Sequence, residues 1–110
     1  MQPSDNENWL IDTGHDILEK KAEQGPESLE PIERLIRAWW VADYGMRNAG
    51  DLQAAFDLDP QFLDDGLSLA SDLELPTTKR AFADGRQSLE ATFFKQFESI
   101  CDELRGAYGR

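Results

Sequence analysis

The strongest constraint on the fold is an apolar stripe near the end of the chain, with members three or four residues apart. It consists of Leu89, Phe93, Phe97, Ile100, Leu104 and Ala107. This spacing places the side chains on one face of a helix. A face of this length has to be buried against other elements. The stripe therefore predicts a long helix packed on a core, opened by Ser88 as its N-cap.

The same period recurs earlier in the chain and predicts further helices. A capping box of Ser4 and Glu7 marks the start of the first, and Gly25-Pro26 its end. Ser28 is expected to cap a second helix, and Gly45 and the 48–50 segment to break it.

Three shorter elements are expected in the second half of the chain. Asp51 is predicted to cap a turn of helix through Phe56. Asp59-Pro60 marks a start, since Asp is a good N-cap and Pro is favoured at the first helical position; this helix is expected to end before Pro76. A last short helix is predicted from 77 or 78 to 84, followed by Gly85 in the left-handed conformation.

Strands are not expected, because β-branched residues are scarce and no alternating run exceeds four residues. A chain of 110 residues fits one domain, and its three Trp and six Phe suffice for an ordered core. The sequence therefore predicts an all-α fold: a single domain over 1–110, built as a compact bundle of about five helices with short loops.

The charge of the chain limits its partners. There are 22 Asp and Glu residues against 11 Lys and Arg, a formal net charge of −11. Such a surface repels bare DNA, RNA and anionic membranes, so we expect no direct nucleic-acid or membrane contact and a basic protein as partner. Nothing at the start resembles a signal peptide, and no run approaches the roughly 20 apolar residues of a membrane span. With a single cysteine, the expected location is the cytoplasm.

Catalytic signatures are lacking. His15 has carboxylates nearby but no nucleophile or oxyanion loop, and we expect it to be an exposed or half-exposed helix residue. Cys101 falls on the apolar stripe and is expected to be inert. No nucleotide-binding glycine motif is present. We expect a protein that is not an enzyme and that has no cofactor.

A metal site was considered at the densest group of acids, Asp57, Asp59, Asp64 and Asp65. Read as a calcium loop from Asp57, the group has Phe62 where the sixth position requires glycine, so the pattern fails. No metal ligand is predicted. A small metal-dependent enzyme that uses these four carboxylates stays open as the least favoured alternative.

Acidic residues follow one another along a single face of the first predicted helix. Asp12, Asp16, Glu19 and Glu23 are four, three and four residues apart. Neighbours at this spacing lie on the order of 5–6 Å apart, which is broadly similar to the separation of phosphates along a DNA strand. We interpret this row as a candidate surface for a basic partner; the other interpretation is a solvated face kept acidic for solubility.

A second acidic region lies between Arg47 and Lys79, where seven carboxylates occur without a basic residue. The candidate partner-binding residues in it are Asp57, Asp59, Asp64, Asp65 and Asp72.

Adjacent Trp39 and Trp40 cannot both point into one core from a helix, so one of them or Tyr44 is expected at the surface. We predict an interface with a partner or a second copy at these three aromatics, with burial of both tryptophans between helices as the alternative.

The second half of the chain also has a recognisable order of segments. It runs from a glycine-centred segment at 43–52 through a helix at 62–73, the junction Leu75-Pro76 and a helix ending in Ala81-Phe82 to a long acidic helix at 89–108. In this order it resembles the bacterial helical DNA-mimic family, a domain of unknown function. One glycine stands at Gly45 where the family has a pair, and the aromatic doublet before Asn48 is missing. The resemblance implies a helical, usually dimeric acidic protein that occupies the DNA-binding surface of a basic regulator.

Charge and resemblance together favour an acidic protein–protein interaction module, a DNA-mimic-type inhibitor of a basic nucleic-acid-binding protein. An immunity-type antitoxin against a basic toxin has nearly the same surface chemistry and differs only in its partner. Both alternatives predict binding that weakens with salt.

Overall fold

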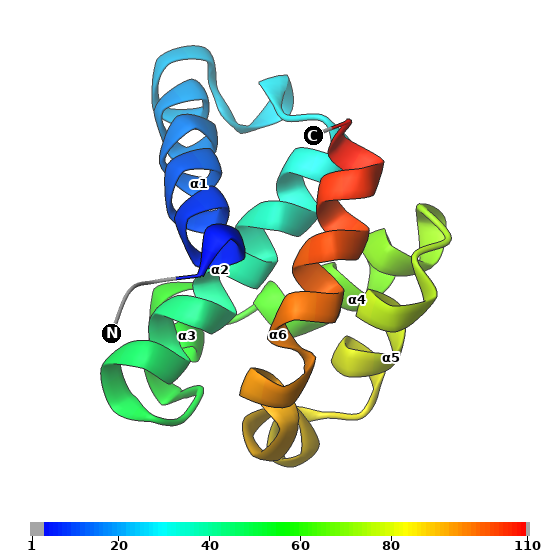
Figure 1. The fold of residues 1–110 in the computed structure, drawn as a ribbon. Coiled ribbons are helices and arrows are strands. Elements are labelled where there is room, and N and C mark those ends of the chain that lie inside the picture. Colours follow the sequence, from blue (N-terminus) through cyan, green and yellow to red (C-terminus); the bar gives the residue numbers. More distant parts are fainter. Residues whose placement is uncertain (1–3, 110) are drawn as a thin grey trace.

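In the computed structural model, residues 4–109 are described, and they form helices joined by short connections (Figure 1). The elements are α1 (Asp5–Gln24), the 3-10 turn η1 (Pro26–Ser28), α2 (Pro31–Ala49), α3 (Gln53–Leu58), α4 (Phe62–Asp72), α5 (Pro76–Ala83) and α6 (Arg86–Tyr108). No strand occurs between residues 4 and 109. The predicted all-α bundle of about five helices is confirmed, and the predicted turn of helix after Asp51 is the short helix α3. Residues 1–3 and 110 of the predicted domain lie outside the described range.

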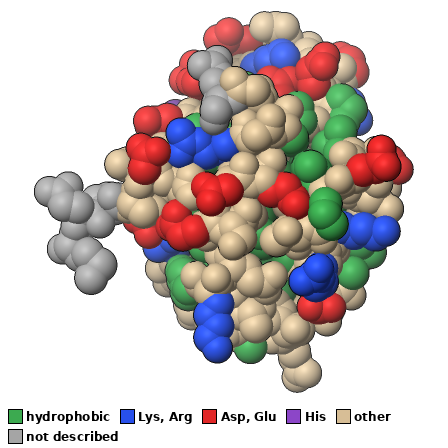
Figure 2. All heavy atoms as spheres, turned by 45° about the vertical axis from the view of Figure 1, so that its right-hand side comes forward, with side chains coloured by type: hydrophobic (Ala, Val, Ile, Leu, Met, Phe, Trp, Pro, Cys, Tyr) green, Lys and Arg blue, Asp and Glu red, His purple; other side chains and the backbone are tan. Residues whose placement is uncertain are grey.

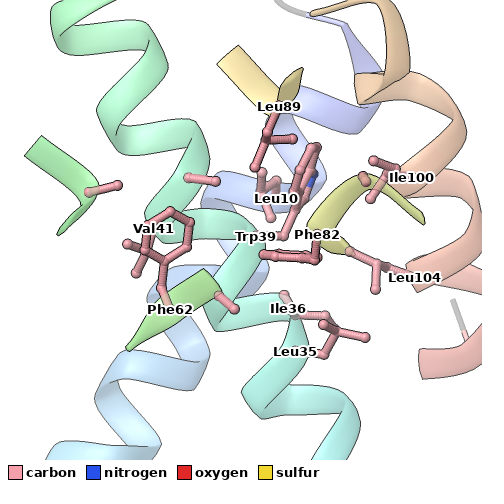
Figure 3. Close-up of a cluster of buried hydrophobic side chains, with 14 of the residues drawn as sticks. Leu10, Leu35, Ile36, Trp39, Val41, Phe62, Phe82, Leu89, Ile100 and Leu104 are labelled. Atoms are coloured by element: carbon pink, nitrogen blue, oxygen red, sulfur yellow. The ribbon is translucent and has the colours of Figure 1, made fainter. Parts of the chain in front are cut away.

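Helix α2 runs through the middle of the fold, with α1 on one side and α6 on the other (Figure 1). Its Trp39 is completely buried and stacks on Phe93, with the ring centroids 4.6 Å apart. Phe97 stacks on the same indole, and Phe82 meets it edge-on. Figure 3 shows Trp39 and Phe82 among the aliphatic side chains of the core. Such aromatic contacts add about 0.5–1.5 kcal/mol per pair beyond area burial.

The first helix begins and ends as its sequence predicts. The Ser4 hydroxyl accepts a hydrogen bond from the backbone N–H of Glu7 at 3.1 Å, and the Glu7 carboxylate accepts one from the Ser4 N–H at 3.2 Å. This reciprocal pair satisfies backbone donors that a helix start leaves free. Gly25, with a φ of 89°, ends the helix.

The predicted start of the second helix is wrong, and of the two predicted breaks only the 48–50 segment ends it. Glu30, not Ser28, is its N-cap, and Ser28 lies in η1. Gly45 does not break α2 but is buried within it, where a Cβ would lie 3.0 Å from atoms of Ala55. The missing side chain therefore lets α3 approach α2 closely. The helix ends at Gly50, whose φ of 74° is left-handed.

Later helix starts differ from the prediction by one to two residues. Asp51 and Asp59 each accept a hydrogen bond from the backbone N–H two residues on, but α3 begins at Gln53 and α4 at Phe62. These aspartates stabilise the turns that lead into the helices. The helix that was expected from Thr77 or Thr78 begins at Pro76, where the missing N–H costs nothing.

The start of the last helix was also predicted too late. It begins at Arg86, and Ser88 lies within its first turn. Gly85 has the positive φ that was predicted, 90°, but its ψ of 171° is not that of a left-handed helix end: Gly85 is the N-cap residue of α6, and Asp84 is the C-cap of α5.

Two carboxylates of α6 bind backbone N–H groups at the starts of other helices. Glu103 accepts hydrogen bonds from the N–H groups of Thr77 and Thr78, at 3.1 and 2.7 Å, and from the Thr78 hydroxyl at 2.7 Å. Glu90 accepts one from the N–H of Leu52 at 2.8 Å, just before α3. Helix starts carry free N–H groups and a partial positive charge, so these carboxylates fix α5 and α3 against α6.

Candidate protein-interaction surface

The four acids of the first helix point away from the core. Asp12, Asp16, Glu19 and Glu23, here called the α1 row, are all exposed. The opposite side of α1, which includes Leu10 and Ile17, is buried. Within residues 4–109 no member of the α1 row forms an ion pair. These carboxylates are therefore available to a partner.

Helix α1, which carries the row, is held against the rest of the fold by hydrogen bonds and ion pairs. The Asn6 side chain on α1 donates to the carboxylates of Glu98 and Asp102 on α6, at 2.6 and 3.1 Å. On the other side, ion pairs join Glu7 to Arg47 at 3.1 Å and Lys20 to Glu33 at 2.9 Å. From Asp5 to Gln24, α1 thus docks on α2 and α6 and is not a separate arm.

The second group of candidate acids is less uniform. Asp57, Asp64, Asp65 and Asp72 are exposed. Asp59 instead forms an ion pair with Arg37 at 2.8 Å, and both side chains are mostly shielded from solvent. Asp59 therefore has a structural role and is not a free carboxylate. In the described part of the chain, no group of three or more His, Cys, Asp or Glu residues is placed to hold a metal ion, and the four acids considered for a metal site form no such group.

The two acidic regions are not continuous. Lys21, Arg34 and Arg37 line a cavity bounded by the end of α1, by α2 and by α4. These bases adjoin Asp65 of α4, which lines the same cavity. The face seen in Figure 2 likewise carries basic and acidic side chains intermingled. A partner that reads an uninterrupted row of carboxylates therefore finds it on the outer side of α1.

The aromatic candidates divide between core and surface. Trp39 is completely buried, so the prediction of an interface residue at this position is wrong: its ring fills the core between α2 and α6. Trp40 is half-buried and lies against Gly14, where a Cβ would be 2.4 Å from its ring. Tyr44 stacks on Trp40 and is 41% exposed.

An exposed apolar residue of α1 was not identified from the sequence. Ile11 is 50% exposed. The contacts Glu7–Arg47 and Gly14–Trp40 align α1 antiparallel to α2, so Ile11 lies on the same side as Tyr44. Ile11 does not share the three- and four-residue spacing of the buried residues Leu10, Thr13 and Ile17, and this offset is the signal that could have identified it.

The remaining chemical candidates lie as predicted. His15 is an exposed helix residue. Cys101 is buried, and this burial raises the pKa of its thiol to about 12, so almost no thiolate forms at neutral pH. None of the helices between residues 4 and 109 has the length and apolar character needed to cross a bilayer.

Comparison of the chain with protein families, with curated protein sequences and with solved structures found no match. The resemblance to the DNA-mimic family therefore stays a prediction, and the geometry of the surface alone carries the functional argument.

Proposed function

We propose that this protein is an acidic inhibitor of the DNA-mimic type, which binds the nucleic-acid-binding surface of a basic protein through the α1 row. The observation that carries the proposal is that four carboxylates follow one another along one exposed helix face without an ion pair to any described residue. A basic cleft that binds phosphates would meet a comparable linear field there.

The α1 row destabilises its own helix, and this energetic cost supports a role in binding. Like charges at spacings of three and four residues destabilise a helix by about 0.2–0.5 kcal/mol per pair. Ion pairs compensate some other acids, such as Glu7 and Asp43, which both pair with Arg47, but they compensate no member of the row. Lysine or arginine side chains of a partner would remove this repulsion on binding. The net charge of −11 would also steer a basic protein toward the surface from a distance.

An apolar contact beside the row would add to the affinity. Ile11 on α1 and Tyr44 on α2 are exposed, and aromatic side chains are enriched at the centres of protein interfaces. The homodimer implied by the family resemblance would use Tyr44 as well, and size-exclusion chromatography with light scattering tests for it.

Affinity capture from a lysate of the source cell tests the proposal. Three baits are compared: the unchanged protein, a variant with the α1 row changed to lysine, and a control with Asp57, Asp64, Asp65 and Asp72 changed to lysine. Both variants change the net charge equally, and circular dichroism checks that both are folded. Capture is carried out at about 0.05 M and at about 1 M salt, between which the Debye length falls from above 10 Å to about 3 Å.

The expected result is a basic nucleic-acid-binding protein that is retained at low salt, is released at high salt and is lost with the α1-row variant but not with the control. The purified protein should then displace this partner from duplex DNA or RNA. If the captured partner is a transcriptional regulator, the protein acts as a DNA mimic. If the partner is a nuclease toxin, the protein acts as an immunity-type antitoxin. Equal loss with both variants would assign the binding to net charge alone, and unchanged capture by the α1-row variant would contradict the proposal.

A further inference from the structure

A cavity of about 560 Å³ lies on the side of α2 between η1 and α4. Apolar side chains from all three segments line it: Leu29 after η1, Ala38 on α2 and Leu69 on α4. The volume falls within the range of about 300–1,000 Å³ that small-molecule sites occupy, and spaces between the helices of a bundle are a common place for such sites.

One wall of the cavity is held by a closed ion pair. The Arg37 guanidinium donates to Asp59 at 2.8 Å, and the side chains are only 21% and 19% exposed. Asp59 also accepts the backbone N–H of Gln61, so the pair is fixed at the turn before α4. The buried Nε–H of Arg37 has no acceptor among the described residues. The wall therefore retains an unused donor.

Four further charges line the same cavity, and each lacks an ion-pair partner within residues 4–109. Two are basic, Lys21 and Arg34, and two are acidic, Glu27 and Asp65. Opposite charges thus share one cavity, yet none lies within 4.0 Å of another. A ligand of one sign would satisfy one pair of side chains and be repelled by the other.

We infer that this cavity binds a small zwitterion with an apolar side group, of the class of free amino acids and short peptides. The carboxylate of the ligand would lie against Arg34 and Lys21, and its ammonium against Glu27 and Asp65. Its side group would cover Leu29 and Leu69. This site is separate from the α1 row and does not depend on the proposed inhibitor function.

Titration of the ¹⁵N-labelled protein with the dipeptide Leu-Leu, followed by NMR, tests the inference. N-acetyl-Leu-Leu, which lacks the ammonium, and Leu-Leu-amide, which lacks the carboxylate, are titrated in parallel. We expect saturable shifts at Leu29, Ala38 and Leu69 with Leu-Leu, and affinities at least about tenfold lower for the two blocked peptides, since each loses a charge-assisted contact. Equal affinity of either blocked peptide, or no saturable shift with Leu-Leu, would overturn it.

Variants assign the binding to the cavity. Arg34→Ala should weaken Leu-Leu binding at least about tenfold, while Arg80→Ala, which also removes an exposed arginine without an ion pair in the described chain, should leave it unchanged. Ser68→Trp adds a large ring at an exposed position of the lining and should block binding while every charge is kept. Binding that survives Ser68→Trp, or that falls equally in Arg80→Ala, would place it outside the cavity.

Discussion

The inward-facing carboxylates of α6 and the α1 row have opposite relations to the fold. Glu103 and Glu90 accept hydrogen bonds from backbone N–H groups of other segments, and the α1 row makes no ion pair with any described residue. The first set stabilises the bundle, whereas the second adds repulsion along one helix. Acidity thus serves the fold in one region, while in the other it has no structural use. This difference supports the proposal that the α1 row binds a partner.

The largest effect is expected at Glu103. Glu103→Gln replaces the charged acceptor of three hydrogen bonds, two of them from the fully buried Thr78. We expect the free energy of unfolding to fall by about 1–3 kcal/mol, because hydrogen bonds to charged groups are the strong ones. Urea denaturation measures the change. The same substitution in the α1 row, Glu23→Gln, should change stability by no more than about 0.5 kcal/mol. Equal losses would remove the distinction between the two regions.

A smaller and more local effect is expected at Glu90. Glu90→Gln weakens the contact to the Leu52 N–H and the ion pair with Arg86, which is 40% exposed. We expect a loss of about 1 kcal/mol. Hydrogen exchange should show it as faster exchange in α3, while amides at the centre of α2 stay protected. Uniformly faster hydrogen exchange over the whole chain would mean that Glu90 stabilises the entire bundle and not α3 alone.

The α1 row should respond in the opposite direction. Changing Asp12 and Asp16 to Asn and Glu19 and Glu23 to Gln removes the repulsion within three neighbouring pairs of like charges on the helix. We expect stability to rise, by about 0.2–0.5 kcal/mol per neighbouring pair, and thermal unfolding measures the increase. Added salt should stabilise the unchanged protein more than this variant, because it screens the repulsion. A loss of stability would show that the row has a structural role.

The smallest effect is a change with pH. Burial alone would raise the pKa of Glu103, but the hydrogen bonds from Thr78 and Thr77 outweigh it and hold the pKa below the usual 4.5. A carboxyl whose pKa is lowered by folding stabilises the protein above its unfolded pKa, and this contribution is lost as pH falls through the folded pKa. The difference in stability between the unchanged protein and Glu103→Gln should therefore shrink below pH 4.5. A constant difference down to pH 2 would contradict the assignment.

Asp43 contributes to the pH dependence of stability in the opposite direction to Glu103. Burial raises its pKa above the usual 3.8 in spite of the ion pair with Arg47. It therefore costs stability at neutral pH, and this cost disappears as pH falls through its raised pKa. Double variants that include Asp43→Asn separate its contribution from that of Glu103.

What the sequence predicts well in this protein is local. The Ser4–Glu7 capping box, the long stripe of α6 and the exposure of the α1 row each depend on residues within one helix, and periodicity reveals them. The errors arise where distant segments decide. Gly45 continues a helix because Ala55 packs on it, and Asp59 is neutralised by Arg37, which lies 22 residues earlier. No local sequence pattern predicts such contacts between distant segments.

The candidate site shows the same division. The α1 row could be predicted because its spacing alone places it on one face, but the burial of Trp39 and the exposure of Tyr44 depend on where α6 packs. The roles of Glu90 and Glu103 likewise join segments 38 and 25 residues apart. Acids at such positions look like any others in a chain with 22 of them.

The position of α6 after all other helices has a consequence for synthesis on the ribosome. Trp39 is covered by Phe93 and Phe97, and α3 and α5 are each too short to persist without the carboxylates that α6 supplies. A nascent chain that has emerged only as far as α5 therefore carries a large uncovered indole and two unanchored segments. We expect the bundle to be completed only after α6 has left the exit tunnel, and the negative charge of the chain to oppose its association with neighbouring chains until then.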